Sequence, residues 1–279
     1  MKRSLSSFAV VLSSLALVLV GCDEEAKKSE MLAKTQGDAA SAAVAAASAA
    51  PKASASASAA PETKAAPKAA KECASGADLV IDDPDLEAEL RKKLGKLPKA
   101  GEKPAPLRAA ELGTISSVNL TAKASLDELD PCVFPKLSNL KHLYLGKGKL
   151  QDLKPIAGFT QLESLRVAYT EVSDLTPLEK LVKLDRVDLG HTHVRDLTPM
   201  AGLVNITELE LDGDEITDLA PLAKMKKLEK LSIKKTNVTD VSPLRELTKL
   251  KFLYIEGSGV TSYDALGPLV ARGLKIVTK

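Results

Sequence analysis

A 22-residue pattern of apolar side chains recurs without insertion or deletion from Leu140 to Leu250. Each unit opens on an apolar residue, and further apolar residues follow three and five positions later, as in Leu162, Leu165 and Val167. The opening residues are Leu140, Leu162, Leu184, Ile206, Leu228 and Leu250. A fixed period of this length indicates a solenoid, in which like units stack side by side and expose a long surface suited to binding.

Each unit divides into a strand-like part and a returning part. The run from Leu165 to Ala168 alternates apolar and other residues, which is typical of a short strand with one buried face. Farther on, Thr176 before Pro177 reads as a helix cap followed by proline at the first helical position. The same arrangement occurs at Thr198 with Pro199 and at Ser242 with Pro243, whereas Lys154 and Ala220 precede Pro155 and Pro221 without a capping side chain. We therefore expect a strand and a short helical turn in every unit.

One unit cannot bury its own apolar side chains, which occupy about seven inward positions. Stacking at roughly 4.8 Å per strand lets neighbouring units cover each other and form one continuous core. Leu209, in the middle of the array, is one of the residues expected in that core. In the unit that begins at Leu162 the inward positions are Leu162, Leu165, Val167, Val172, Leu175, Leu178 and Leu181.

The recurring pattern L-x-x-L-x-L…V-x-D-L-x-P-L resembles the bacterial leucine-rich repeats of the internalin type, over roughly Ala77 to Lys279. The resemblance implies an α/β solenoid: a right-handed horseshoe with a parallel sheet on its concave side and short 3-10 helices or turns on its convex side. It also implies a helical N-terminal cap and a protein-binding role.

The ninth repeat position, where the family often has asparagine, differs here. Hydroxyls and a carboxylate at this position are expected to satisfy nearby backbone groups. The position holds Gly148, Thr170, Thr192, Asp214, Thr236 and Ser258. A second column contains aspartate in five units, which predicts turn-capping to backbone amides, with a calcium ladder as the alternative. Its members are Asp152, Asp174, Asp196, Asp218 and Asp240.

The two ends of the array carry atypical units. Asp83 and Pro84 predict the start of a helix with Leu86, Leu90 and Leu94 on one face, and Gly95 stops it. We assign residues 73–114 to the helical cap and 115–279 to the repeats, with regular units over 140–271. A first strand is expected at 115–120 and a last one at 274–278.

The first 22 residues have the features of an export signal. Lys2 and Arg3 precede an apolar run from Phe8 to Val20, which is short for an ordinary membrane-spanning helix. The ending Leu19-Val20-Gly21-Cys22 resembles the lipobox of bacterial lipoproteins, which implies cleavage before Cys22 and lipid attachment to it. An ordinary cleaved signal or an uncleaved anchor is the alternative. The prediction is an exported chain, anchored by lipid on the periplasmic or cell-surface side of a bacterial membrane.

Residues 23–72 are dominated by alanine, serine, lysine and proline. A segment so poor in large apolar side chains cannot bury a core, so we expect a disordered tether with a reach of about 40 Å. A transient helix from Ala39 to Ala50 is the alternative for its alanine-rich part. Beyond Cys22, Cys73 and Cys132 form an even pair in an exported chain, which predicts a disulfide.

Several function classes find little support in the sequence. The chain without its first 22 residues has balanced charge and no tryptophan, which argues against nucleic-acid binding. No phosphate loop, nucleophile elbow or paired-cysteine motif is present, so we expect no enzyme activity, cofactor or metal. His191 and His193 are interpreted as solvated loop side chains, with metal ligation as the alternative.

The outward positions of the strands form the predicted contact surface. Exposed aromatic residues and arginine are typical interface anchors. The alternatives are an ordinary solvated sheet face and, for the whole chain, a structural envelope lipoprotein making weak contacts with peptidoglycan or surface polysaccharide. The residues expected to bind a protein or other macromolecular partner are Tyr144, Arg166, Arg186, Asp188, Glu208, Glu210, Lys230, Phe252 and Tyr254.

Overall fold

The structure, a computed structural model, describes Cys73 and residues 78–279. The expected signal peptide, the tether over 23–72 and the lipid attachment site Cys22 lie outside the described residues. In the part of the chain that is described, no helix combines the length and the apolar character needed to cross a membrane.

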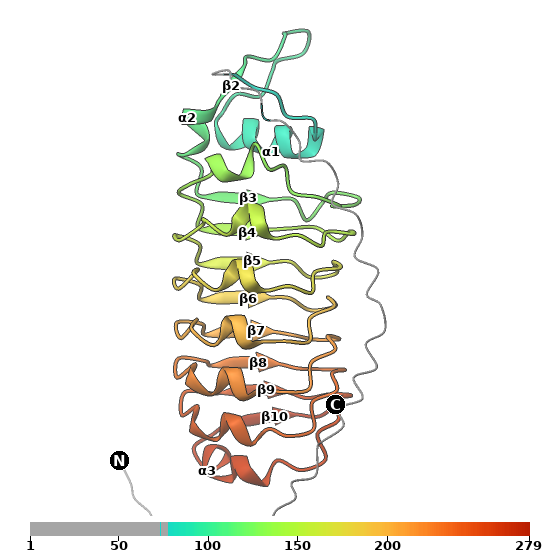
Figure 1. Cartoon of the computed structure of the whole chain (residues 1–279), viewed down its shortest axis with the longest axis vertical. Helices are drawn as coiled ribbons and strands as arrows, with labels where there is room; N and C mark the ends of the chain where they lie inside the picture. The colour runs from blue at the N-terminus through green and yellow to red at the C-terminus, as the bar shows by residue number, and fades with distance from the viewer. Residues whose placement is uncertain (1–72, 74–77) are drawn as a thin grey trace, which may run out of the picture. The chain divides into compact units, whose positions relative to one another are not determined.

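Eight short strands form one parallel sheet in which chain order and spatial order agree, as Figure 1 shows. Neighbouring strands in the repeats pair in the same register, so residues 22 apart lie side by side. The repeat period therefore translates directly into columns of side chains across the sheet. The strands are β3 (Ser117–Asn119), β4 (His142–Tyr144), β5 (Ser164–Arg166), β6 (Arg186–Asp188), β7 (Glu208–Glu210), β8 (Lys230–Ser232), β9 (Phe252–Tyr254) and β10 (Lys275–Val277).

The core lies behind the sheet and runs through all units without a break. The central residue of each strand points into it; Leu165, Leu209 and Leu253 are at most 2% exposed. All seven inward positions predicted for the unit at Leu162 are buried, which confirms the assignment of faces. Burial of this regular kind stabilises each unit only through its neighbours, as expected of a solenoid.

The side of the array opposite the sheet consists of 3-10 helices, each with one buried apolar residue, which is the third residue in η2 to η7 and the first in η1. Proline is the second residue of six of these seven helices, where no backbone donor is needed. The helices are η1 (Phe134–Lys136), η2 (Lys154–Ile156), η3 (Thr176–Leu178), η4 (Thr198–Met200), η5 (Ala220–Lys224), η6 (Ser242–Glu246) and η7 (Asp264–Leu266).

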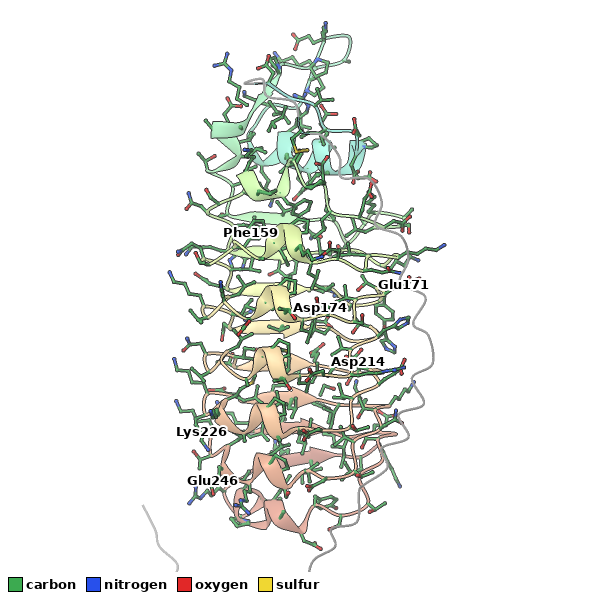
Figure 2. All side chains as sticks on the ribbon, in the orientation of Figure 1. Phe159, Glu171, Asp174, Asp214, Lys226 and Glu246 are labelled. Carbon is green, nitrogen blue, oxygen red and sulfur yellow. A yellow bond between two sulfur atoms is a disulfide. The ribbon has the colours of Figure 1, made fainter. Side chains whose placement is uncertain are left out.

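The predicted caps on these helices are wrong. Thr176 is the first residue of η3, and its side chain does not cap the helix. Instead, the backbone N–H of Thr176 donates to Oδ1 of Asp174 over 2.8 Å, a turn that preorganises the start of the helix. All five aspartates of the column accept such a bond at the same 2.8 Å, so the turn-capping interpretation is confirmed. Figure 2 shows Asp174 in this position.

The N-terminal cap contains the predicted helix, α1 (Pro84–Lys93). Oδ1 of Asp83 accepts hydrogen bonds from the N–H groups of Asp85 and Leu86, and Gly95 follows the helix in a left-handed conformation. Leu86 and Leu90 are fully buried, whereas Leu94 at the C-cap is only partly buried. Three further elements of the cap were not foreseen from the sequence: β1 (Asp78–Leu79), which pairs antiparallel with β2 (Leu107–Arg108), and α2 (Ala109–Leu112).

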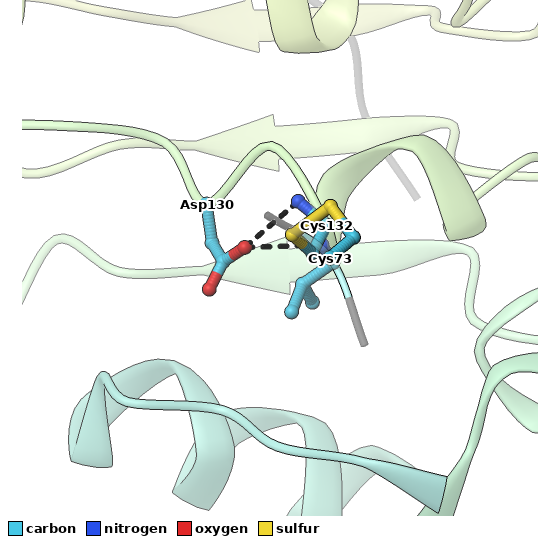
Figure 3. The surroundings of a disulfide bond; sticks show 4 residues. Cys73, Asp130 and Cys132 are labelled. Atoms are coloured by element: carbon cyan, nitrogen blue, oxygen red, sulfur yellow. Dashed lines mark hydrogen bonds between the residues drawn. A yellow bond between two sulfur atoms is a disulfide. The ribbon is translucent and has the colours of Figure 1, made fainter. Parts of the chain in front are cut away.

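Cys73 and Cys132 form a disulfide, the pairing expected from the sequence. The bond joins the start of the described chain to the opening unit of the array across a separation of 59 residues. Asp130 supports this segment, because its Oδ1 accepts the backbone N–H of Cys132 over 2.8 Å (Figure 3).

The last unit departs from the regular pattern. Helix η7 lacks the repeated proline and continues into a short helix, α3 (Gly267–Val270), before the chain enters β10. Strands β3 and β10 lie within the ranges expected for the first and last strands, but each has only three residues.

Candidate interaction surface

Two columns of side chains cover the exposed face of the sheet from β4 to β10, one from the first and one from the last residue of each of these strands. The register places them as the sequence predicted, with all nine expected contact residues among them. The first column is His142, Ser164, Arg186, Glu208, Lys230, Phe252 and Lys275, and the second is Tyr144, Arg166, Asp188, Glu210, Ser232, Tyr254 and Val277. The geometry thus brings the nine residues onto one surface, and their role in binding stays a prediction.

Two serines in these columns are buried, contrary to the expectation that every outward position is exposed. Ser164 and Ser232 are 7% and 3% exposed. Both have short side chains beside longer neighbours, and the Ser232 hydroxyl donates to Oδ1 of Asp212 over 2.5 Å. The surface available to a partner is therefore supplied mainly by the long side chains, among which Arg186 and Phe252 are exposed.

Cross-strand ion pairs order the centre of the face. Arg166 and Asp188, opposite each other on β5 and β6, approach to 3.3 Å. On the other side of the centre, Lys230 Nζ lies 2.6 Å from Glu210 Oε1. Such half-exposed pairs contribute only about 0–1 kcal/mol each to stability. Their main effect is to hold the charged groups in place, while Glu208 has no ion pair among the described residues.

An aromatic and basic patch occupies β8 to β10. The rings of Phe252 and Tyr254 stack with centroids 6.4 Å apart. The ammonium groups of Lys230 and Lys234 lie 5.9 Å from the Tyr254 ring, and that of Lys275 lies 5.7 Å from the Phe252 ring. These cation–π contacts fix flexible lysine side chains around two rings, which gives a preordered contact patch. We name these five residues the aromatic–lysine patch.

The two outer lysines of this patch are not among the nine expected contact residues, although the alternation of Lys230, Ser232 and Lys234 predicts that Lys234 faces outward. Lys234 lies two residues beyond β8 and reaches back, where its Nζ also lies 3.0 Å from Asp212 Oδ2. Lys275 begins β10, so it is the seventh member of the first column. A last strand was expected around Lys275, so the sequence did contain a signal for it. The sixth unit is irregular, however, and the 22-residue period therefore does not give the register of Lys275 in the sheet.

A second feature, unforeseen from the sequence, lies in the turns that follow the strands. Tyr169 and His191 both have left-handed backbones, at φ 62° and 60°, and their rings stack with centroids 4.5 Å apart. The next two equivalent positions are the left-handed Gly213 and Lys235. His191 is exposed as expected, but it packs on Tyr169 instead of standing free in solvent. Glycine at Gly213 and Gly257 was the available signal for a left-handed turn.

Electrostatics single out two carboxyl groups near the centre of the sheet. Burial raises the pKa of Asp188, and the neighbouring Glu210 adds to this effect against the hydrogen bond from Gly190. Burial also raises the pKa of Asp214 to about 6, opposed by two hydrogen bonds from Thr192 and reinforced by Asp188 and Asp212. A hydrogen bond to Glu210 raises the pKa of Lys230, which favours the protonated, positively charged form of this lysine.

Solved structures with this architecture include internalins and another leucine-rich-repeat protein. An internalin (InlF) of Listeria monocytogenes matches with a TM-score of 0.60 and 25% identity, over 68% of this chain and 54% of that one. Internalin C2 of the same organism matches with a TM-score of 0.58 and 23% identity, over 71% and 93% of the two chains. A leucine-rich-repeat protein of Leptospira interrogans gives 0.50 and 20%, over 60% and 50%.

These likenesses show the fold. The chain is a leucine-rich-repeat solenoid similar to the internalins, and the match spans about half the length of the first of them. No protein-family model and no curated protein sequence matches the chain. Any specific activity or partner therefore has to be argued from the surface described above.

Proposed function

We propose that this chain is a non-catalytic binding module, anchored by lipid on Cys22 to a bacterial membrane, that recognises a protein partner through the exposed face of its parallel sheet. The observation that carries the proposal is the aromatic–lysine patch beside an ordered band of charges. Leucine-rich-repeat folds of this type generally act as interaction modules, and the arrangement offers partner contacts over several strands.

The chemistry of the face supports a protein partner. Phe252 is 37% exposed and Tyr254 half-buried, so their rings offer apolar area at little cost in side-chain entropy. Arg166, Lys230 and their acidic partners provide both signs of charge close to the rings. Aromatic anchors surrounded by fixed polar groups are typical of protein interfaces.

Anchoring rests on the sequence of the first 22 residues. The basic start, the apolar run and the terminal cysteine together support export and lipidation at Cys22. The expected tether over 23–72 would hold the repeat domain away from the membrane surface, where a partner can reach it.

The test is crosslinking in intact cells, followed by purification of the tagged chain and mass spectrometry. The native chain is compared with an Arg186→Glu, Phe252→Ala double variant. Both side chains are exposed, and Arg186 pairs only with the adjacent Asp185 over 3.4 Å among the described residues, so these changes should leave the fold intact. A Lys180→Glu, Val204→Ala variant alters exposed side chains away from the strands and serves as the control.

We expect a protein captured by the native chain and by the control variant, and lost from the sheet-face variant. Equal capture by all three folded chains would contradict the assignment of the surface. Capture of wall glycan alone, unaffected by either double substitution, would instead favour the structural envelope role. Metabolic labelling with radioactive palmitate, compared between the native chain and Cys22→Ser, tests the anchor separately.

A further inference from the structure

The ninth position of the units lies in a turn that is buried at Thr170, Thr192, Asp214 and Thr236, and in three units a hydroxyl there bonds to the backbone. The Thr170 hydroxyl donates to the carbonyl of Val167 over 2.8 Å, that of Thr236 to Ile233 over 2.8 Å, and that of Ser258 to Ile255 over 2.7 Å. In each case the acceptor is the carbonyl three residues earlier. Three of the six units therefore use this place for a side chain that donates a hydrogen bond to the backbone, whereas Gly148 has no side chain and the Thr192 hydroxyl donates to Asp214.

Asp214 occupies the same place in the unit of β7 and is only 2% exposed. Its Oδ1 accepts the N–H and the hydroxyl of Thr192, over 2.7 and 2.9 Å. Its Oδ2 is buried and has no hydrogen-bond partner among Cys73 and residues 78–279. In the units of Thr170, Thr236 and Ser258 the acceptor is the carbonyl three residues earlier, which here is that of Leu211; it accepts the backbone N–H of Asp214 over a long 3.5 Å. An ionised carboxylate has no proton to give, so only the protonated acid can donate to this carbonyl as the hydroxyls do. Figure 2 shows Asp214 in this turn.

The charged groups around Asp214 do not compensate a negative charge on it. Asp188 on β6 and Asp212 just after β7 are carboxyl groups that oppose its ionisation. Lys234 from the following unit is engaged with Asp212 at 3.0 Å, and Arg195 from the preceding turn is engaged with Glu215 over 2.8 Å. His191, in the preceding turn, is stacked on Tyr169. A buried charge without a partner is costly, and proton uptake removes that cost.

We propose that Asp214 is a proton switch built into the centre of the repeat array. With its proton on, Oδ2 donates to the carbonyl of Leu211 and completes the ladder. With its proton off, an uncompensated charge lies buried beside Asp188 and Asp212 and weakens the junction between the units of β6 and β7. This switch concerns the fold itself and holds whether or not the sheet face binds a protein.

The sign of the resulting pH dependence is defined. The pKa of Asp214 rises from an ordinary 3.8 to about 6 in the folded chain, so folding takes up a proton between these values. The stability that the bound proton adds to the folded chain is fully present below about pH 4 and is lost as the pH rises to about 6. This loss increases the unfolding constant by about 100-fold in total. Asp240 acts in the opposite sense, because the hydrogen bond from the Ser242 N–H lowers its pKa.

The first test is the urea midpoint of the native chain and of Asp214→Asn, measured from pH 4 to 7.5. Asparagine has nearly the same shape and keeps an N–H donor at every pH. As the pH rises from 4 to 6, we expect the native chain to lose stability relative to the variant. The ratio of the native to the variant unfolding constant should grow by up to about 100-fold over this range and stay constant above it. Parallel curves would overturn the proposal. Asp218→Asn, an exposed turn residue, is the control and should follow the native curve.

A second measurement needs no variant. The Thr192 N–H donates to Asp214, so its amide nitrogen resonance should titrate with that carboxyl, with a midpoint near pH 6. A Thr192 midpoint at or below pH 4 in the native chain would overturn the switch, even where Asp214→Asn fails to fold.

Discussion

Replacement of Leu209 by alanine tests the stacked core at its centre. Leu209 is fully buried in β7 and lies in register between Val187 on β6 and Leu231 on β8, both at most 2% exposed. Hydrogen bonds hold the strands on both sides, so the surroundings cannot close the space that is left. Leucine-to-alanine changes in cores cost about 2–5 kcal/mol, and this restraint places Leu209 in the upper half of that range.

The assay is urea denaturation followed by circular dichroism. With a denaturant slope of about 2–3 kcal/mol per molar, a loss of about 4 kcal/mol lowers the midpoint by about 1.5 M. Leu97→Ala is the matched control, because this leucine of the cap is 58% exposed and its loss should change stability by less than about 0.5 kcal/mol. A Leu209→Ala midpoint equal to that of Leu97→Ala would refute the argument that neighbouring units supply each other's core.

Three further changes probe the turns and the cap. Asp196→Ala removes the acceptor that binds the Thr198 N–H and should cost about 1 kcal/mol in urea denaturation, whereas Asp196→Asn keeps an acceptor oxygen and should cost less. Cys132→Ser opens a loop closed over 59 residues and should cost about 4 kcal/mol; a native chain whose denaturation midpoint does not change on reduction would contradict this. Gly213→Ala should cost about 1–3 kcal/mol, because φ is +74° and the new Cβ would lie 2.6 Å from His191 Nδ1; Gly158→Ala, with open space around it, is its control.

The sequence predicted the array well because a repeat states the same information several times. Alternation around Leu165 and Leu209 fixed which strand positions are buried, and the invariant 22-residue spacing fixed the register of the columns. The cap helix was equally legible, since Asp83, Pro84 and Gly95 mark its ends. These features depend on local chemistry or on the period, both of which one sequence displays.

Other features depend on geometry that residue types do not specify. Thr176 before Pro177 suggested a helix cap, but the Thr176 side chain does not cap the helix. Instead, the backbone N–H of Thr176 donates to Asp174, two residues earlier in the chain. The tight turn after each strand sets the left-handed backbones of Tyr169 and His191, and the stacking of their rings stabilises this conformation. Residue propensities do not predict either feature. The position of Lys275 beside Phe252 depends on the path of the irregular last unit, which the repeat period does not describe.

The most direct measurement of the central claim is the affinity of the purified repeat protein for the captured partner, compared among the native chain, the sheet-face variant Arg186→Glu, Phe252→Ala and the control variant Lys180→Glu, Val204→Ala. We predict that the sheet-face variant binds at least about 100-fold more weakly, because this factor corresponds to about 2.7 kcal/mol and anchor residues commonly cost about 2 kcal/mol or more each. The control variant should bind like the native chain. Equal affinity of all three, with unfolding midpoints unchanged, would contradict a binding role for the exposed face of the sheet.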